Sequence, residues 1–420
     1  MMRLHKIALI WILILSACGT PRITSVPVTM TISPTIAWQT YFVDNELGSD
    51  ANSGTQAQPW KTIRKVNSEM ANFKPGDSVL FKRGHTWILN ASGEAGSLVI
   101  SSSGVTFGAY GSGNLPLFNG TNMQDTGNTM WKGMVVFGNV SYVTLEDLDL
   151  YNAIKQQIGI GIQGARSDHI TIQDCTIRTN RTNGFMLMYV ENDNNPNSVT
   201  NIVIRDNQIY DSKWNAMRIT GGVTNVFIYG NAIHDVIHNG IDTYPTKNNN
   251  SNFQIYDNNI YNFGIGASGA GIYIPGTDDA EVFNNNIHDS QGTNDTYGVK
   301  AGSENGFVNK NVVVRSNQIW NINSPNSNTY GLWFDSCTNC GAFNNTLYAN
   351  TDTILDQNNA YLSIKNNLAY ANLKDQKSMR NYDQDPQFVN AVAGDVHLQP
   401  SSPACIAGEN GTYIGAYPCQ

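Results

Sequence analysis

One short motif recurs along this sequence and restricts the folds that the chain can adopt. The copies are aligned on an asparagine two positions before the last aliphatic residue, and steps of 24, 27, 27, 32, 28 and 22 residues separate them. This asparagine column holds Asn207, Asn231, Asn258, Asn285, Asn317, Asn345 and Asn367. Two earlier copies have Leu148 and Cys175 at the same position. A repeat period of roughly 20–50 residues is typical of a solenoid.

Each copy alternates aliphatic and polar residues, as in Val226 and Ile228, which indicates a strand rather than a helix. An asparagine side chain turned into the core needs hydrogen-bond partners, because leaving a buried polar group unpaired costs about 1–3 kcal/mol. Amides stacked at the ~4.8 Å spacing of paired strands can each donate to the next amide and accept from the previous one. This ladder resembles that of the pectin-lyase fold. The resemblance implies an all-β, single-stranded right-handed parallel β-helix with three strands in each rung, a rung being one turn of the solenoid.

The segments that flank the repeats resemble the ends of secreted β-helix proteins. Tyr41–Asp44 and Pro75–Phe81 enclose a helical run, as in an N-terminal cap whose helix covers the open end of the solenoid. A cap is physically needed, because the first rung otherwise exposes its core and its unpaired strand edge. We therefore expect a β-helix domain at 41–420, with a cap region at 41–90, regular rungs at about 140–375 and a C-terminal tail at 376–420.

The N-terminus reads as a processing signal. Arg3 and Lys6 precede an apolar run that is too short to span a membrane as a mature helix, Ile7–Leu15. The sequence Leu15-Ser16-Ala17-Cys18 resembles the bacterial lipoprotein box, which implies a signal peptide at 1–17 and lipidation of Cys18. A plain secretory peptide is the alternative. A Thr/Ser/Pro-rich tether follows at 18–40, so we expect an extracytoplasmic protein held by a lipid anchor at the bacterial cell surface or in the periplasm.

Composition and cysteine usage fit this location. Charged residues make up 14% of the chain, against about 25% in ordinary globular proteins. The net charge of −8 argues against nucleic acid as a partner, and we expect a monomer. Cys405 and Cys419 lie 14 residues apart in the tail and form a plausible disulfide. Cys337 and Cys340 are either a small disulfide or two thiols, and Cys175 is expected to be a buried thiol.

A column of outward-facing side chains is the candidate site. Between ladder motifs the sequence repeats a small residue followed by an aliphatic one, as in Gly298-Val299 and Gly331-Leu332. If the aliphatic residue points inward, the next residue points outward. The outward column is Met186, Arg218, Asp242, Tyr273, Lys300 and Trp333. Aromatic faces suit sugar rings and cations suit uronate carboxylates. We therefore expect a polysaccharide partner, acidic in character, bound by Tyr273, Trp333, Tyr244, Tyr297, Tyr330, Asn215 and Asn239.

The segment Tyr297-Gly298-Val299-Lys300-Ala301-Gly302 resembles the lysine rung of the calcium-dependent pectate lyases of polysaccharide lyase family nine. The resemblance implies β-elimination on a uronate, with Lys300 as the base. It also implies bound Ca²⁺, for which Asp242 is the candidate ligand and Asp235 and Asp211 are possible helpers. Calcium needs several oxygen ligands. Arg218 is the alternative group that would neutralise the uronate, and thus the second catalytic candidate.

Other functions stay open at this point. A glycoside hydrolase needs two carboxylates ~5 or ~6.5–9.5 Å apart, whereas Asp242 and Asp335 are expected three rungs, or ~14 Å, apart. An epimerase is a further, weaker alternative. His234 and His288 occupy the position that Tyr210 and Tyr261 occupy in their own repeats, which favours a structural role. A non-catalytic carbohydrate-binding or structural β-helix protein is the main alternative to an enzyme.

Overall fold

The computed structural model describes residues 38–123, 133–152, 158–163, 166–178, 188–191, 199–325, 328–372, 382 and 384–419. Trp38–Gln420 forms one compact unit. The predicted signal peptide, the lipidation site Cys18 and the tether up to residue 37 lie outside the described residues. Among the described residues, no helix combines the length and the apolarity needed to cross a membrane.

Three parallel sheets run along the unit. The first sheet consists of β1 (Thr40–Val43), β2 (Ser78–Lys82), β5 (Thr106–Tyr110), β8 (Ser141–Glu146), β11 (Asp168–Gln173), β14 (Thr200–Arg205), β17 (Thr224–Tyr229), β20 (Asn250–Tyr256), β23 (Thr277–Phe283), β27 (Val313–Arg315), β31 (Gly341–Phe343) and β34 (Ser363–Lys365), with β26 (Asn309–Lys310) and β30 (Cys337–Thr338) beside them. The second sheet consists of β4 (Leu98–Ile100), β7 (Gly133–Gly138), β10 (Ile158–Gln163), β13 (Met188–Glu191), β16 (Met217–Thr220), β19 (Ile241–Asp242), β22 (Gly269–Tyr273), β25 (Thr296–Ala301), β29 (Thr329–Asp335) and β33 (Ile354–Gln357).

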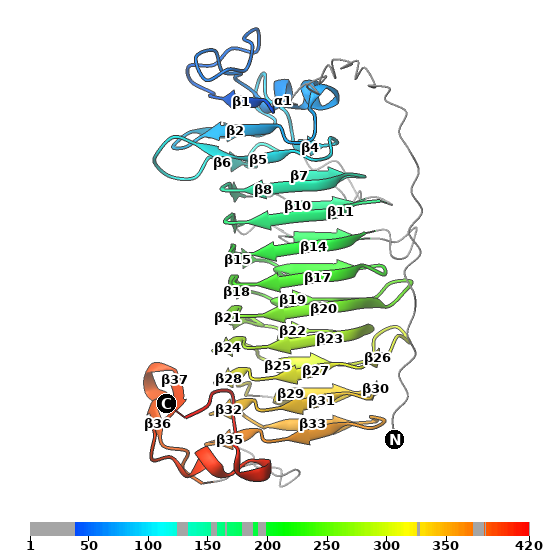
Figure 1. Ribbon diagram of the computed structural model, residues 1–420, viewed down its shortest axis with the longest axis vertical. Helices are drawn as coiled ribbons and strands as arrows, with labels where there is room; N and C mark the ends of the chain where they lie inside the picture. The colour runs from blue at the N-terminus through cyan, green and yellow to red at the C-terminus, as the bar shows by residue number, and fades with distance from the viewer. Residues whose placement is uncertain are drawn as a thin grey trace, which may run out of the picture. The chain divides into compact units, whose positions relative to one another are not determined.

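The third sheet consists of β3 (Thr86–Ile88), β6 (Leu117–Asn119), β9 (Asp149–Tyr151), β12 (Thr176–Arg178), β15 (Gln208–Ser212), β18 (Ala232–Val236), β21 (Asn259–Phe263), β24 (Asn286–His288), β28 (Gln318–Trp320), β32 (Thr346–Tyr348) and β35 (Leu368–Tyr370). Each rung contributes one strand to each sheet, as β17, β18 and β19 do, and successive rungs stack in register (Figure 1). The chain is a right-handed parallel β-helix with three strands per rung, as the sequence predicted.

The predicted asparagine ladder is present and continuous. The Nδ2 of each ladder asparagine donates to the Oδ1 of the next, from Asn207 to Asn367, over 2.8–3.0 Å. The backbone N–H of each of these residues donates to the same oxygen. Cys175 continues the column as a buried thiol, and burial raises its pKa to about 12. The ladder therefore satisfies the buried polar groups of the turn between the first and third sheets.

The residue before each ladder asparagine explains why the turn repeats. It adopts a positive φ of 52–66° in every rung from Asn207 onward. The residues are Asp206, Gly230, Asp257, Asn284, Ser316, Asn344 and Asn366. Glycine, asparagine and aspartate tolerate this left-handed conformation best. The pairs Asp-Asn, Gly-Asn and Asn-Asn in the sequence are therefore the signature of one turn used repeatedly.

The two ends of the solenoid are closed differently. Helix α1 (Ile63–Glu69) begins at Thr62, whose side chain accepts from the backbone of Lys65, and it buries Ile63 and Val66. Its N-terminal position is the one predicted for a capping helix (Figure 1). A short 3₁₀ helix, Met70–Asn72, follows α1. After the last rung, the chain forms an antiparallel pair of strands, β36 (Phe388–Asn390) and β37 (Asp395–Leu398). The same region contains three 3₁₀ helices, Ala391–Ala393, Pro403–Ile406 and Glu409–Gly411.

The described residues contain two disulfides, one in the C-terminal tail and one between two nearby cysteines of the solenoid. Cys405 pairs with Cys419 in the tail. Cys337 pairs with Cys340, so of the two alternatives the structure has the small disulfide. In the described part of the chain, Cys175 is the free cysteine.

Candidate functional site

The register of the second sheet aligns the candidate residues. Arg218, Asp242, Tyr273, Lys300 and Trp333 pair in this order across β16, β19, β22, β25 and β29. This is the order that strand alternation predicted. Met186 lies outside the described residues, and the strand register instead gives Tyr189 as the partner of Arg218.

Glycines before these residues have a packing reason. A Cβ atom at Gly271 would lie 2.4 Å from the side chain of Ile287, and one at Gly298 would lie 2.4 Å from that of Ile319. The second sheet thus passes so close to the third that only glycine fits at these positions. The repeated pair of a small residue and an aliphatic residue in the sequence is explained by this close approach of the two sheets.

Lys300 stands in a box of aromatic rings. Its Nζ lies 4.2 Å from the ring centre of Trp333, 4.8 Å from that of Tyr273 and 5.2 Å from that of Tyr297. Burial lowers the pKa of Lys300, although the negative charges of Glu304, Asp335 and Asp295 oppose this shift. The box fixes the position of the nitrogen and makes its neutral form more accessible than that of a solvated lysine.

The tyrosines of the box are more buried than a sugar-binding surface requires. Tyr273, Tyr297 and Tyr330 are at most 9% exposed and form a hydrophobic cluster with Ala270, against which Trp333 packs. The sequence predicts that these rings offer open faces to a sugar, and the structure buries them instead. Their close mutual packing leaves Trp333, which is half-buried, as the most accessible of them.

One buried donor of the box has no partner. The Tyr273 hydroxyl donates to Glu304 Oε2 over 2.6 Å. In contrast, Trp333 Nε1 is buried and lacks a hydrogen-bond partner among the described residues. Burial, the negative charge of Asp295 and a hydrogen bond to that carboxylate raise the pKa of Tyr297, so its hydroxyl stays protonated. An unpaired buried donor such as Trp333 Nε1 is costly unless a ligand satisfies it.

A pocket of about 190 Å³ opens beside this box. It is lined by His238, Asn239, Ser268, Gly269, Ala270, Tyr273, Asp295, Tyr297, Lys300 and Trp333. It thus joins four residues of the predicted site in the second sheet, and the predicted Asn239, to a histidine and an aspartate from the loops. Asp295 and His238 were not predicted as site residues, and Glu304 was also missed. All three lie outside the repeating strand pattern from which the site was predicted.

Asp242 lies in the predicted column, but it does not face solvent. It is 2% exposed, its Oδ2 accepts from Asn215 Nδ2 over 2.6 Å, and its Oδ1 has no partner among the described residues. Burial raises the pKa of Asp242 to about 6, although Arg218 and hydrogen bonds from Asn239 and Asn215 oppose the shift. The sequence predicts an exposed carboxylate at this position, and that part of the prediction is wrong, because neighbouring side chains cover Asp242.

Arg218 is engaged with the same rung. Its guanidinium lies 4.0 Å from the ring centre of Tyr244, and its Nη1 lies 3.9 Å from Asp242 Oδ2. The ring face of Tyr244 that meets Arg218 is therefore unavailable to a sugar. Arg218 lies three rungs from Lys300 in the register, about 14 Å in strand spacing.

Asn215 and Asn239, expected to contact substrate, form a short buried ladder instead. The Oδ1 of Asn215 accepts from the backbone of Asn239, and the Oδ1 of Asn239 accepts from the backbone of Ala270. The same Asn215 oxygen lies 3.0 Å from His238 Nδ1. Because that oxygen is an acceptor, His238 Nδ1 must carry the proton, which leaves Nε2 as an acceptor.

His238 is thereby a neutral base at the pocket. Its ring stacks on Trp214 with the ring centres 4.6 Å apart. Burial, together with the positive charges of Arg218 and Lys300, lowers the pKa of His238 to about 4. At neutral pH the imidazole is therefore uncharged.

In the described part of the chain, the predicted calcium ligands do not come together in one site. The described residues contain no group of three or more histidine, cysteine, aspartate or glutamate side chains that could hold a metal. The polar groups in contact with Asp242 include the amide of Asn215 and the guanidinium of Arg218. Asp235 accepts from the His234 ring and from Asn262 in the turn after the third-sheet strand. Asp211 occupies the equivalent turn one rung earlier, with a φ of 58°.

His234 and His288 are stacking residues of the third sheet. A continuous column of stacked rings runs through Tyr210, His234, Tyr261, His288 and Trp320, with ring centres 4.3–5.2 Å apart. His234 and His288 therefore occupy equivalent positions because they stack in this column, which is the structural role that the sequence indicated.

Comparisons with known proteins agree with the fold. Residues 133–309 match the family described as right handed beta helix region. A lacto-N-biosidase of Bifidobacterium longum is 30% identical over 142 residues, which is 29% of this chain and 9% of that protein. The chain therefore spans less than a tenth of the length of this curated relative.

Two solved structures are similar over most of the unit. Pectate lyase Pel9A superposes with a TM-score of 0.58 at 14% identity, covering 91% of this chain and 96% of that one. The GH136 lacto-N-biosidase of Eubacterium ramulus gives a TM-score of 0.50 at 16% identity, covering 91% of this chain and 67% of that one. At these identities the likeness shows the parallel β-helix fold alone.

Proposed function

We propose that this protein acts on a polysaccharide, and that it cleaves a uronate-containing chain by β-elimination at the Lys300 pocket. The observation that carries the proposal is the aromatic box around Lys300, which combines a lysine of lowered pKa with ring surface and an unpaired donor, Trp333 Nε1, beside a pocket. The similarity to lacto-N-biosidases and to a pectate lyase supports carbohydrate as the class of substrate.

The chemistry follows from the position of Lys300. Its neutral amine takes the C5 proton of the uronate, the C4–O4 bond breaks, and a C4–C5 double bond forms. The resulting ammonium is a proton donor for the departing oxygen. Arg218, three rungs away, binds a carboxylate of a neighbouring sugar rather than the reacting one. We derive no step from calcium, since the donor set does not fit it.

The test is the ultraviolet absorbance of the new double bond. The protein from Trp38 onward is incubated with pectate, alginate and glycosaminoglycans, with calcium and then with EDTA. An increase in absorbance that the Lys300→Ala variant lacks is expected. An increase that EDTA removes would restore calcium to the mechanism, and no increase on any uronate would refute the elimination.

Hydrolysis is the second candidate. Asp242 carries a proton up to a pKa of about 6, as a general acid requires, and its Oδ1 has no hydrogen-bond partner among the described residues, although Asp242 is not part of the lining of the Lys300 pocket; Asp295 is. The curated relative also has a name that denotes a glycosidase. A hydrolase would release reducing ends without ultraviolet absorbance, and Asp242→Asn would abolish that release.

We also propose that the protein is lipidated at Cys18 and held at the bacterial envelope. The supporting observation is the sequence Leu15-Ser16-Ala17-Cys18 after an apolar run. Metabolic labelling with a fatty acid analogue should mark the full chain and not its Cys18→Ser variant. A soluble, unlabelled, exported protein would favour the plain secretory peptide.

A further inference from the structure

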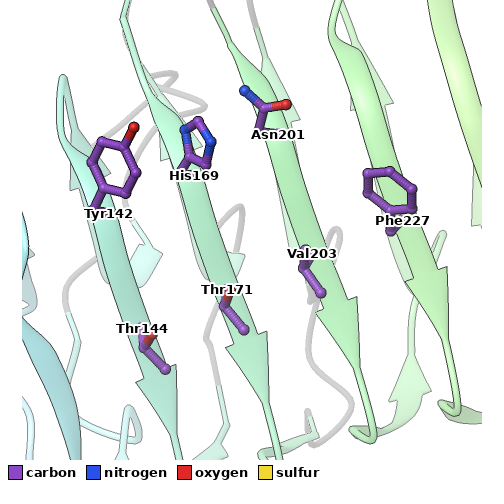
Figure 2. A pocket seen from close by; sticks show the side chains of 7 residues that line it. All are labelled: Tyr142, Thr144, His169, Thr171, Asn201, Val203 and Phe227. Carbon is purple, nitrogen blue, oxygen red and sulfur yellow. The ribbon is translucent and has the colours of Figure 1, made fainter.

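A second hollow lies on the outer face of the first sheet, away from the sheet that carries Lys300. It has a volume of about 450 Å³ and spans β8, β11, β14 and β17 (Figure 2). Its lining consists of Tyr142, Thr144, His169, Thr171, Asn201, Val203 and Phe227. Neither the proposed elimination nor the proposed hydrolysis uses any of these residues.

The hollow has a floor of small side chains between aromatic ones. The register aligns Thr144, Thr171, Val203 and Phe227 in one row across the four strands. Tyr142 and His169 stack beside this row, with ring centres 4.4 Å apart and planes 15° apart. The row covers three strand spacings, about 14 Å, so the hollow is long enough for a stretch of chain-like ligand.

The backbone at Tyr142 is the unexpected feature. Tyr142 has a φ of 59°, and it stands at a turn position that asparagine or aspartate occupies in the six rungs from Asn201 to Asn339. A bulky side chain in this left-handed conformation is disfavoured. Tyr142 is also 64% exposed, so burial does not compensate for the strain. Tyr361 has the same conformation at an equivalent turn outside the hollow, so the turn tolerates a tyrosine, and the stacking on His169 is what distinguishes Tyr142.

Asp168 orders the side chains next to the tyrosine. Its Oδ2 lies 2.8 Å from His169 Nδ1, and its Oδ1 accepts from Asn201 Nδ2 over 2.8 Å. Burial opposes ionisation, but the hydrogen bonds from Asn201 and His169 prevail and hold the pKa of Asp168 below its usual range. The ring that supports Tyr142 is thus fixed before any ligand arrives, which lowers the entropic cost of binding.

We propose that this hollow is a second, non-catalytic glycan-binding surface, which holds a stretch of polysaccharide away from the Lys300 pocket. The apolar C–H face of a sugar packs against the exposed ring of Tyr142 and the half-buried ring of Phe227, and its hydroxyls meet Thr144, Thr171 and Asn201. The lining has no carboxylate or lysine side chain, so it needs no charged sugar.

Affinity electrophoresis tests the proposal. Protein from Trp38 onward carrying Lys300→Arg, which leaves the polymer intact, is run through gels that contain pectate, alginate, hyaluronan or soluble xylan. Adding Tyr142→Asn removes the ring but suits the left-handed turn, so folding is kept. We expect it to weaken retention by at least one polymer about fivefold. Tyr361→Asn is the matched control, because Tyr361 has a φ of 64° at the equivalent turn and is 85% exposed outside the hollow.

The proposal is overturned if Tyr142→Asn leaves retention unchanged on every polymer, including the case in which neither protein is retained. It is also overturned if Tyr361→Asn weakens retention equally. Specific capture of a second protein by the hollow, with no polymer retained, would assign the surface to a different class of partner. Because binding is measured without turnover, none of these results depends on the elimination chemistry.

Discussion

Opposing effects act on Lys300. Removal from water favours the neutral amine, whereas the faces of three aromatic rings and the nearby carboxylates favour the ammonium. The net direction is a lowered pKa. A base needs this balance, since a lysine of ordinary pKa, about 10.4, is almost fully protonated at neutral pH. The rate of elimination should therefore rise with pH and level off below the ordinary lysine pKa.

Replacement of Lys300 by arginine should separate binding from chemistry. Arginine keeps the positive charge and the contact with the rings, but it stays protonated and cannot act as a base. We expect turnover to fall about 10²–10⁴-fold, with binding of the polysaccharide largely retained in gel retardation. Lys310→Arg, at an exposed lysine of the first sheet, is the control. Equal turnover in Lys300→Arg and wild type would remove Lys300 from the role of base.

Asp242 should destabilise the folded protein as the pH rises. Its folded-state pKa is raised from 3.8 to about 6, so the folded state binds a proton that the unfolded state has lost between these values. Stability is complete below the unfolded pKa and falls through this window, by up to about 3 kcal/mol. Asp242→Asn keeps the shape and removes the charge. It should raise the unfolding midpoint at pH ~7 and make no difference at pH ~4. A difference that is the same at both pH values would contradict this account.

At the scale of the element, the buried ladder is what holds each turn. Asn258 Oδ1 accepts from both the side chain and the backbone of Asn231, while its Nδ2 donates to Asn285 and to the carbonyl of Ile228. One side chain therefore satisfies groups in three rungs. The interactions extend in both directions along the solenoid, so a defect in the middle of the ladder affects two neighbours.

Asn258→Ala tests this ladder. The change leaves the Asn231 N–H and the Ile228 carbonyl without these partners, so we expect a loss of about 2–4 kcal/mol in the free energy of unfolding. Urea denaturation measures it. Asn259→Ala, at the neighbouring half-buried position, removes contacts with Asn286 and His288 only and should cost less than about 1 kcal/mol. Similar losses in the two variants would show that the ladder adds no special stability.

At the scale of the whole molecule, a solenoid is stable only if its ends are closed. Contacts pass from each rung to its neighbours, so an exposed terminal rung offers an apolar core and a free strand edge to other molecules. Helix α1 prevents this at the first rungs by packing Ile63 and Val66, both fully buried, against the core.

Val66→Asp should open this end. The new carboxylate enters a fully buried position, and an unpaired buried charge is strongly unfavourable. We expect faster hydrogen exchange in β1, β2 and β4 and increased light scattering at concentrations where the wild type does not scatter. Ser68→Asp, on the exposed side of the same helix, is the control and should behave as wild type. Unchanged exchange in Val66→Asp would mean that the helix does not protect the end.

The repeating parts of the structure were predictable from the sequence, and the site was predictable only in part. Strand alternation and a ladder asparagine in each rung from Asn207 to Asn367 fix the register, so the order from Arg218 to Trp333 followed from counting residues. The alignment of Met186 with Arg218 failed where the ladder step lengthens to 32 residues after Cys175. In that rung the register pairs Tyr189, and not Met186, with Arg218.

The sequence by itself determined the solenoid, its ladder and the column that carries Lys300, because these depend on periodic contacts that are the same in every rung. Only the tertiary structure decided which side chains of that column can reach a ligand. It buries Asp242 under Asn215, covers Tyr244 with Arg218 and brings Glu304 to Tyr273. Those contacts join non-equivalent residues of different rungs and loops, so their geometry depends on how particular side chains fill space and not on any period of the sequence.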